Sequence, residues 1–465
     1  MNKTAENPPR FNWIMITAIL LLALGLRLIH LDSMEFKGDE AFNLMRAREL
    51  AHLRSFPLTS ATSSTGIPEP PIFMYLPSLP IFISDDAIFV TGAIAVLNVF
   101  AILLCYILVR RYISPLAALI SALLFAVNPW QVLYSRKIWT QNLLPFFSLL
   151  FLLLMFEAVF RNKPRLVSLA LITLALAVQL HLSAAFMIPY AIVFLLWQRR
   201  MVRLRDVMLG MMVGLILFLP YFIYLGQHAM EISRIIMDRS HEPFVLRSSA
   251  VFIPLQLATT SGFAHETVLF SSYATFIRGM VSLTSFEVIA RLLLLLGLII
   301  GVLHRSAVTR ALAGYALLGI AYIFASNTQI FPHYYNAQLP VFFILISLPT
   351  AALISMKKRL PAVISAFVIC LLLVSQLYFT YSILQFISHE DCIWSEYGPP
   401  YRVQVAEVAM AVSELERQGI PPDFKIVHER VSSCVNWDIK ATEYLVKRFV
   451  GWDIRSGGGS SGMER

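Results

Sequence analysis

Long apolar runs constrain this chain more than any other feature of its sequence. Eleven stretches of about 20 mostly apolar residues are each long enough to span a bilayer as an α-helix. They cover residues 12–31, 86–109, 114–133, 142–160, 166–183, 182–198, 207–225, 286–303, 311–326, 337–356 and 361–387. Only 14% of the residues are charged, whereas a soluble protein usually carries about 25%. The sequence therefore predicts a polytopic α-helical membrane protein with about 11 transmembrane helices.

The basic residues predict the orientation of these spans. Alternate short gaps, together with Lys3 and Arg10, hold 16 of the 37 Lys and Arg residues. By the positive-inside rule these gaps and the N-terminus face the cytoplasm, and an odd number of spans places the C-terminus outside. The net charge of +9 is then explained by topology and by anionic lipid, and we expect no nucleic-acid partner. The first span has no cleavage site and is expected to stay as a signal-anchor.

The external gaps differ most in length and polarity. They are the loops 32–85 and 226–285, the turns 128–141 and 326–338, and the tail from residue 388. The apolar stretches inside the loop 226–285 are too short or too polar to span, so we expect them to lie in the membrane interface or under a lid. Residues 1–387 are therefore predicted to form one transmembrane module with two large external loops.

Residues 388–455 have the composition of a soluble segment and predict a small external α/β domain. The expected elements are a helix over 403–418, a strand over 424–428 and a helix over 441–449. The last stretch, 456–465, is rich in glycine and serine and predicts a flexible tail.

Two of the four cysteines, Cys392 and Cys434, fall in the predicted external domain. An oxidising exterior permits a disulfide between them, and two free thiols are equally compatible with the sequence. Cys105 and Cys370 lie within spans, where a cysteine is normally a small buried hydrophobe.

A pair of carboxylates, Asp39 and Glu40, follows the first span and opens an amphipathic segment. Such acids often only cap a helix or carry a favourable charge in its first turn. Basic residues nearby, among them Arg46, oppose the topology signal on the external side, and an anionic lipid phosphate would account for them. This stretch is therefore the first candidate site.

Three further candidates lie on the same predicted face. Glu69 stands in a proline-rich segment, Arg136 and Lys137 follow the third span, and His333 and Tyr334 precede the tenth. The two basic residues could instead extend to lipid headgroups, and the aromatic residues could form an interface belt. All four groups lie at the external face, which favours an enzyme that acts there on a lipid-borne substrate.

Four short motifs carry a family resemblance. They are Gly38-Asp-Glu-Ala41, Glu69-Pro-Pro71, Tyr134-Ser-Arg136 with Asn142, and Phe331-Pro-His-Tyr-Tyr335. Through them, over roughly residues 10–350, the chain resembles the integral-membrane glycosyltransferases of the GT-C fold, near the protein O-mannosyltransferases and the aminoarabinose transferase of lipid A. The resemblance implies sugar transfer from a polyprenyl phosphate to an acceptor hydroxyl of a protein, glycan or lipid, with inversion. The resemblance also implies that this reaction takes place at the outer face of a bacterial cytoplasmic (inner) membrane.

The resemblance implies roles for single residues. Asp39 would be the catalytic base with Glu40 as its helper, while Arg136, Lys137 and His333 would bind the substrate phosphate and Tyr334 would shape the pocket. Arg46 is a further substrate-binding candidate, on the ground of its charge at the external side alone. Glu69 matches a carboxylate that helps to bind a metal in the aminoarabinose branch. Pro70 follows it where that branch has a lysine. A divalent Mg, Mn or Zn ion is therefore one expectation, and no metal is the other.

A transporter or lipid flippase is the alternative function. Such proteins usually place charges or broken helices near the middle of the membrane. The predicted spans are nearly free of charge, and Arg27 and Arg291 lie close enough to the outer ends of their helices to reach the interface. This pattern favours the enzyme.

Overall fold

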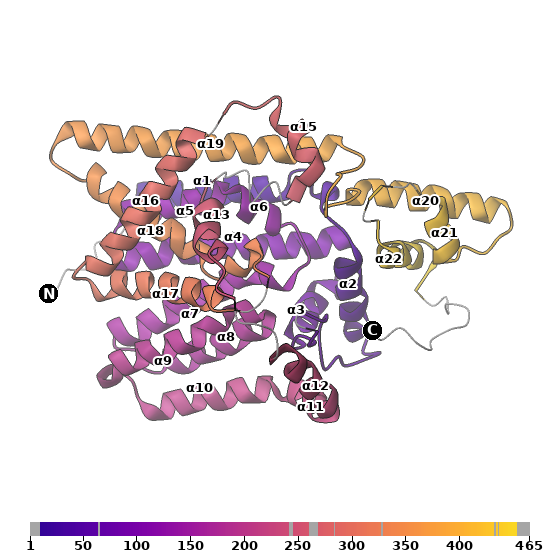
Figure 1. The fold of residues 1–465 in the computed structure, drawn as a ribbon, viewed down its shortest axis with the longest axis horizontal. Coiled ribbons are helices and arrows are strands. Elements are labelled where there is room, and N and C mark those ends of the chain that lie inside the picture. Colours follow the sequence, from indigo (N-terminus) through magenta and orange to yellow (C-terminus); the bar gives the residue numbers. More distant parts are fainter. Residues whose placement is uncertain are drawn as a thin grey trace.

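The computed structural model describes residues 10–63, 66–240, 245–259, 268–282, 284–326, 329–431, 434–435 and 437–452. Over these ranges the chain is built from helices, and pairing between extended segments is limited to two isolated bridges. Most of the long helices run along the longest axis of the molecule and form a bundle, with shorter helices at one end (Figure 1).

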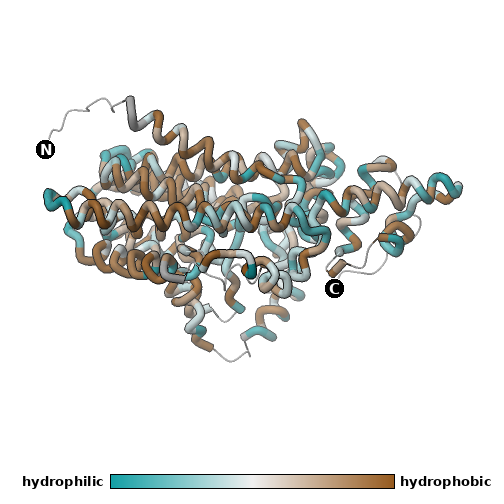
Figure 2. The backbone as a smooth tube through the Cα atoms, turned by 90° about the horizontal axis from the view of Figure 1, so that it is seen from above, coloured by the Kyte–Doolittle hydropathy of each residue, from teal (hydrophilic) through white to brown (hydrophobic). Residues whose placement is uncertain are grey.

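The bundle contains the apolar helices. They are α1 (Arg10–Leu28), α4 (Ala87–Tyr112), α5 (Pro115–Val127), α7 (Leu144–Phe160), α8 (Leu166–Leu180), α9 (Met187–Trp197), α10 (Leu204–Leu217), α11 (Leu219–Gln227), α16 (Thr284–Leu303), α17 (Ala307–Phe324), α18 (Leu339–Ile354) and α19 (Arg359–His389). Figure 2 shows that apolar residues dominate these helices, while hydrophilic residues gather toward the two ends of the bundle.

Every predicted span coincides with one helix or with two consecutive helices. By length and composition, five of the described helices are long enough to cross a membrane, and α10 with α11, bent by 50°, would make a sixth. The remaining apolar helices are shorter. The chain is thus a multi-pass membrane protein, whereas the number of eleven crossings stays a prediction.

Helix α18 forms the centre of the bundle. Its residues from Leu339 to Ala351 are all buried, and it packs against α5 and α16. Gly297 of α16 makes this contact close, because a Cβ atom there would lie 2.1 Å from the backbone oxygen of Leu345. Small residues at helix crossings allow such an approach in membrane proteins. The close contact thereby fixes the central helix in the bundle.

Arg27 is fully buried in α1, so the prediction that it extends to the interface is wrong. Its guanidinium donates hydrogen bonds to the backbone oxygens of Ala23 and Ala126, each at 3.1 Å. Because α5 ends at Val127, the last oxygens of that helix have no partner within it. Arg27 therefore caps α5 and joins it to α1.

Shorter helices lie at the end of the bundle where α1 leaves it. They are α2 (Gly38–Ala51), α3 (Ile72–Ile81), α6 (Pro129–Tyr134), α12 (Ala229–Ser240), α13 (Ser249–Leu257) and α15 (Tyr273–Ile277), with the 3-10 turns η1 (Leu31–Ser33), η2 (Thr140–Leu143), η3 (Leu182–Phe186), η5 (Phe270–Ser272) and η6 (Pro332–Tyr335). A further 3-10 turn, η4 (Arg199–Met201), lies within the basic gap between α9 and α10. Helix α2 packs against α3 and crosses the direction of the bundle (Figure 1).

The C-terminal unit consists of α20 (Tyr401–Arg417), α21 (Phe424–Arg430) and α22 (Ile439–Val450), and α22 packs against α2. A disulfide joins Cys392 to Cys434. The predicted strand over 424–428 is wrong, because these residues form α21. The Asp423 side chain accepts a hydrogen bond from the backbone N–H of Lys425 at 2.9 Å and starts that helix. The predicted flexible tail, 456–465, lies outside the described residues.

Candidate active site

A cavity of about 430 Å³ opens at the end of the bundle that carries α2. Its lining comes from α2, the loop before α3, the segment from α6 to η2, the break between α8 and η3, η6, and the segment after α19. Of the residues predicted from the sequence, Asp39, Glu69, Arg136, Lys137, His333 and Tyr334 line it. Segments far apart in the chain thus meet around one space.

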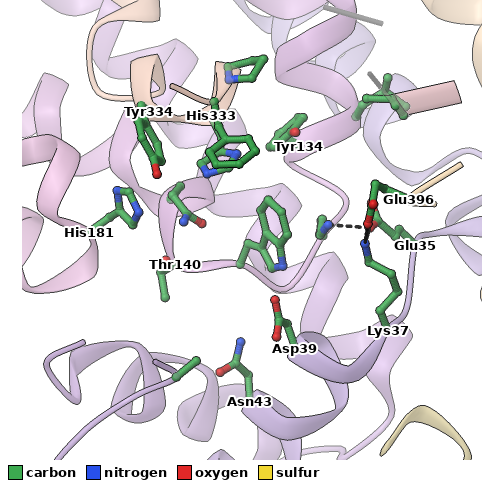
Figure 3. Close-up of a pocket in the computed structure, with 18 of the residues that line it drawn as sticks. Glu35, Lys37, Asp39, Asn43, Tyr134, Thr140, His181, His333, Tyr334 and Glu396 are labelled. Carbon is green, nitrogen blue, oxygen red and sulfur yellow. Dashed lines mark hydrogen bonds and ion pairs between the residues drawn. The ribbon is translucent and has the colours of Figure 1, made fainter. Parts of the chain in front are cut away.

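Asp39 lies in the first turn of α2, and its carboxylate is exposed to the cavity (Figure 3). No residue that the structure describes donates a hydrogen bond to it. Asn43, one turn further along α2, lines the same space, and its amide donates to the backbone oxygen of Ile138 at 3.5 Å. Helix α2 therefore presents the Asp39 carboxylate to the cavity, and the hydrogen bond of Asn43 holds the helix in place one turn away.

Gly38 allows the C-terminal unit to approach this carboxylate. A Cβ atom at Gly38 would lie 2.3 Å from a side-chain oxygen of Asp438. Asp438 is itself fixed, because it accepts a hydrogen bond from the backbone N–H of Lys440 at 2.7 Å and caps α22. Glycine at the start of α2 is thus a packing requirement, which gives the Gly-Asp-Glu motif a structural reason.

One side of the cavity, which we call the ionic wall, carries Glu35, Lys37, Lys137 and Glu396, with Glu40 behind them. The Lys137 ammonium lies 2.6 Å from Glu35 and 3.4 Å from Glu40. The Lys37 ammonium lies 2.9 Å from Glu35 and 3.6 Å from Glu396. Two lysines are thereby shared among three glutamates. Figure 3 labels Glu35, Lys37 and Glu396 of this group.

Burial and the two lysines act in opposite directions on the pKa values of these acids. Burial alone would raise the pKa of Glu35, but Lys137 and Lys37 outweigh it and hold that pKa below its usual value. For Glu40 burial prevails and raises the pKa. Burial would lower the pKa of Lys37, yet Glu35 and Glu40 raise it, so Lys37 stays charged. The ionic wall therefore keeps cations at the cavity surface.

Glu40 does not line the cavity, although the sequence suggested it as a helper of Asp39. It is fully buried, and one oxygen accepts a hydrogen bond from the backbone N–H of Lys37 at 2.9 Å. A glutamate at the third position of a helix that reaches back in this way stabilises the helix start. Glu40 therefore holds the turn on which Asp39 stands.

The opposite side, which we call the neutral wall, carries Glu69, Thr140, His181, His333 and Tyr334 (Figure 3). The Glu69 carboxyl lies 3.6 Å from the His181 Nε2 atom and has a hydrogen bond with the Thr140 side chain. Burial raises the pKa of Glu69 to about 8, since no lysine or arginine compensates it. At neutral pH most of this carboxyl is therefore protonated and can both donate and accept hydrogen bonds.

His181 is held in one orientation. Its Nδ1 atom accepts a hydrogen bond from the backbone N–H of Ser183 at 3.2 Å, which assigns the ring proton to Nε2, on the side of Glu69. His333 stands among aromatic rings, with Tyr334 at 4.9 Å and Trp139 at 5.2 Å between ring centres. Burial, His181 and Lys137 lower the pKa of His333 well below its usual value, so this histidine is neutral.

Two predicted phosphate ligands have other partners. Arg136 borders the cavity, but its guanidinium is bonded to backbone oxygens at the end of α1, including those of Leu26 at 3.4 Å and His30 at 2.5 Å. It caps α1 as Arg27 caps α5. Arg46 does not reach the cavity. It lies two turns, or about 10 Å, along α2 from Asp39 and pairs with Glu49 at 3.6 Å.

Sequence reasoning missed His181, Thr140 and Asn43 as cavity residues. His181 lies where the predicted spans 166–183 and 182–198 meet, at a break between two apolar runs. A histidine at such a break had to lie near a membrane surface, which was the available signal. Asn43 stands four residues after Asp39, so it shares a helix face with the carboxylate.

The predicted metal role of Glu69 finds few partners. Within the described ranges no group of three or more His, Cys, Asp or Glu side chains is placed to hold an ion. Glu69 and His181 give two donors, whereas catalytic zinc sites usually have about three protein ligands. The residues present do not fit a metal held by the protein alone, and no step below uses one.

A family model described as dolichyl-phosphate-mannose-protein mannosyltransferase matches residues 68–224. This match includes Glu69, Lys137 and His181 but begins after Asp39. A sequence search of curated proteins gave no match.

Two solved structures are similar to this chain over most of its length. ArnT from Cupriavidus metallidurans, bound to undecaprenyl phosphate, is 13% identical with a TM-score of 0.53, and the match covers 94% of this chain and 85% of that one. The oligosaccharyltransferase of Archaeoglobus fulgidus is 14% identical with a TM-score of 0.51, over 88% of this chain but only 60% of that one. At such low identity the likeness is one of fold. The chain thus has the GT-C fold of the integral-membrane glycosyltransferases.

Proposed function

We propose that this protein is a glycosyltransferase that moves a sugar from a polyprenyl-phosphate donor to an acceptor hydroxyl at the outer face of a bacterial cytoplasmic membrane. The observation that carries the proposal is Asp39, a carboxylate without a hydrogen-bond donor among the described residues, set between two contrasting walls of one cavity. A similar protein of the same fold was solved with undecaprenyl phosphate, which supports a donor of this lipid class.

The two walls suggest how the donor lies. The ionic wall offers the lysines that a phosphate needs, and the polyprenyl chain can extend along the apolar bundle. The neutral wall offers the hydroxyl of Thr140, the Nε2–H of His181 and the carboxyl of Glu69. Such groups suit sugar hydroxyls, because each can form a hydrogen bond without bringing an unpaired charge into the site. The anomeric carbon then lies between the walls, near Asp39.

The reaction is a single displacement. Asp39 accepts the proton of the acceptor hydroxyl while the hydroxyl oxygen forms a bond to the anomeric carbon. The bond from that carbon to the phosphate oxygen breaks, and its electron pair stays on the phosphate, where the ionic wall stabilises the added charge. One displacement inverts the configuration at the anomeric carbon. Glu40 contributes by holding the first turn of α2 in place.

The transporter alternative gains no support from the buried charges. Arg27, the fully buried arginine of α1, is bonded to backbone oxygens and serves as a helix cap. The groups that remain available to a substrate lie at one end of the bundle instead.

A transfer assay tests the proposal. The full chain in nanodiscs is given polyprenyl phosphates that carry radiolabelled mannose, glucose or arabinose, together with a membrane extract as the source of acceptors. We expect one donor to lose its label to an acceptor, and Asp39→Asn to reduce this rate by about 1000-fold. Asp32→Asn, which changes an exposed acid of the same loop outside the cavity, is the matched control and should keep full activity. Equal rates for Asp39→Asn and wild type would refute the mechanism.

A further inference from the structure

The C-terminal unit supplies part of the cavity. Glu396 and Tyr397, in the segment between α19 and α20, line it. This segment is fixed at both ends: Ile393 and Gly398 form a bridge, and the Tyr397 hydroxyl donates to the backbone oxygen of Ser33 at 2.6 Å. Glu396 is therefore carried on an anchored backbone beside the ionic wall, while its side chain is 80% exposed.

Lys37 has two anionic partners of unequal kind. Glu35 lies 2.9 Å from its ammonium, is only 13% exposed and is also held by Lys137. Glu396 lies further away, at 3.6 Å, and has no second cation within reach among the described residues. An ion pair whose acid is exposed to solvent is weak, so water or another anion can replace Glu396 at small cost. The contact to Glu35 is fixed, and the contact to Glu396 is exchangeable.

Lys137 offers no such exchange. Its ammonium is buried, is shared between Glu35 and Glu40, and lies 3.3 Å from the centre of the Trp139 ring. Moving it toward a ligand would leave the buried carboxylate of Glu40 without its paired cation and Glu35 with Lys37 alone, which is costly. Lys37 is consequently the cation of the ionic wall that can bind an incoming anion directly.

We propose that Lys37 binds the phosphate of the lipid donor and that Glu396 is a resident counter-ion which this phosphate displaces. This inference rests on the proposed function, because it takes the anion to be a polyprenyl phosphate. A phosphate oxygen can make a charge-assisted hydrogen bond to the ammonium in place of the long contact to Glu396. The segment that leads into the C-terminal unit thereby takes part in substrate binding.

The exchange also has a consequence for release of the product. The donor is a phosphodiester with one negative charge, whereas the polyprenyl phosphate that remains after transfer carries nearly two at neutral pH. Such a product would bind a lysine more tightly than the donor does. Glu396, held next to Lys37 by its anchored backbone, competes with the product for the ammonium and favours its departure.

Equilibrium binding of undecaprenyl phosphate to the full chain in nanodiscs tests the inference. Lys37→Met should weaken binding by about tenfold, and Glu396→Gln should tighten it by about threefold. The double variant should bind as Lys37→Met alone does, because Glu396 acts only through Lys37. Asp391→Asn is the matched control: Asp391 is 83% exposed in the same segment, pairs with Arg402 and should have no effect.

Two controls in the same experiment test which lipid supplies the phosphate and whether the variants are correctly folded. Undecaprenol or phosphatidic acid, added in excess, should not displace bound undecaprenyl phosphate. The Lys37→Arg variant, which keeps the positive charge, should retain most of the binding that Lys37→Met loses. Unchanged binding by Lys37→Met, or weaker binding by Glu396→Gln, would overturn the inference. If no sugar is transferred from any donor while undecaprenyl phosphate binding still depends on Lys37, the proposed function fails and this inference stands. Normal transfer by Lys37→Met would instead overturn this inference and leave the proposed function standing.

Discussion

The two walls of the cavity treat buried glutamates in opposite ways. On the ionic wall Glu35 lies 2.6 Å from Lys137 and 2.9 Å from Lys37, and its pKa is held below the usual value. On the neutral wall burial raises the pKa of Glu69 to about 8, because its partners are hydrogen-bonding groups without charge. A buried glutamate is therefore an anion on one side of Asp39, at Glu35, and mostly a neutral acid on the other side, at Glu69.

This contrast shows that the neighbours, more than the residue type, decide what a buried carboxyl does. Desolvation acts on both acids, and only a close cation reverses it. A substrate with a charged phosphate and an uncharged sugar matches this contrast: the phosphate suits the ionic wall and the sugar suits the neutral wall. The following predictions test whether the walls differ as described.

The largest effect is expected on the ionic wall. Lys137→Met removes the cation shared by Glu35 and Glu40 and should lower the free energy of unfolding by about 3 kcal/mol, because buried Glu40 loses its paired cation and Glu35 keeps only Lys37. Denaturant unfolding in detergent measures this. Adding Glu40→Gln to the variant should recover part of the loss. A Lys137→Met protein as stable as wild type would show that the wall does not depend on this charge.

A smaller effect, on activity, is expected at the neutral wall. Glu69→Ala removes the hydrogen bonds of the carboxyl and should lower kcat/KM by about 100-fold. Glu69→Gln keeps a neutral group of the same shape and should stay within about fivefold of wild type. The ratio of the two variants in the transfer assay is the measurement. If glutamine were as harmful as alanine, Glu69 would act as an anion and the contrast between the walls would be wrong.

The smallest effect concerns pH. Because the pKa of Glu69 is raised from 4.5 to about 8, the folded protein keeps a proton there that the unfolded chain has lost. The free energy of unfolding therefore falls as pH rises from 4.5 to 8 and is level above it. Activity should decline severalfold as pH rises through 8, since the hydroxyl donor is lost. In Glu69→Gln this decline should be absent from the pH profile of kcat/KM, and its persistence would assign it to another group.

The spans and α2 could be predicted because their signals are local. A run of about 20 apolar residues allows few structures, and the pair Asp39 and Glu40 after such a run indicates a helix start. The prediction of a strand over Phe424–His428 is wrong because a run of five residues that mixes apolar and polar side chains fits either structure. Asp423 before it was the overlooked helix cap.

The candidate site was predicted in part. Asp39, Glu69, Lys137, His333 and Tyr334 all border the cavity, since polar groups at the same end of a helical bundle have few other places to go. Arg136 also borders the cavity, but its backbone partners at the end of α1 lie more than 100 residues away in the chain, so no local signal could reveal them. The part played by Glu396 was equally hidden, as nothing local brings the segment after α19 to Lys37.

A structure of Asp39→Asn with a bound polyprenyl-phosphate sugar tests the central claim most directly, because this variant should hold the donor without turning it over. We predict a phosphate oxygen within about 3 Å of the Lys37 ammonium, with the sugar against Glu69 and His181 and its anomeric carbon facing residue 39. A phosphate bound at the neutral wall, or a donor bound outside the cavity, would contradict the account.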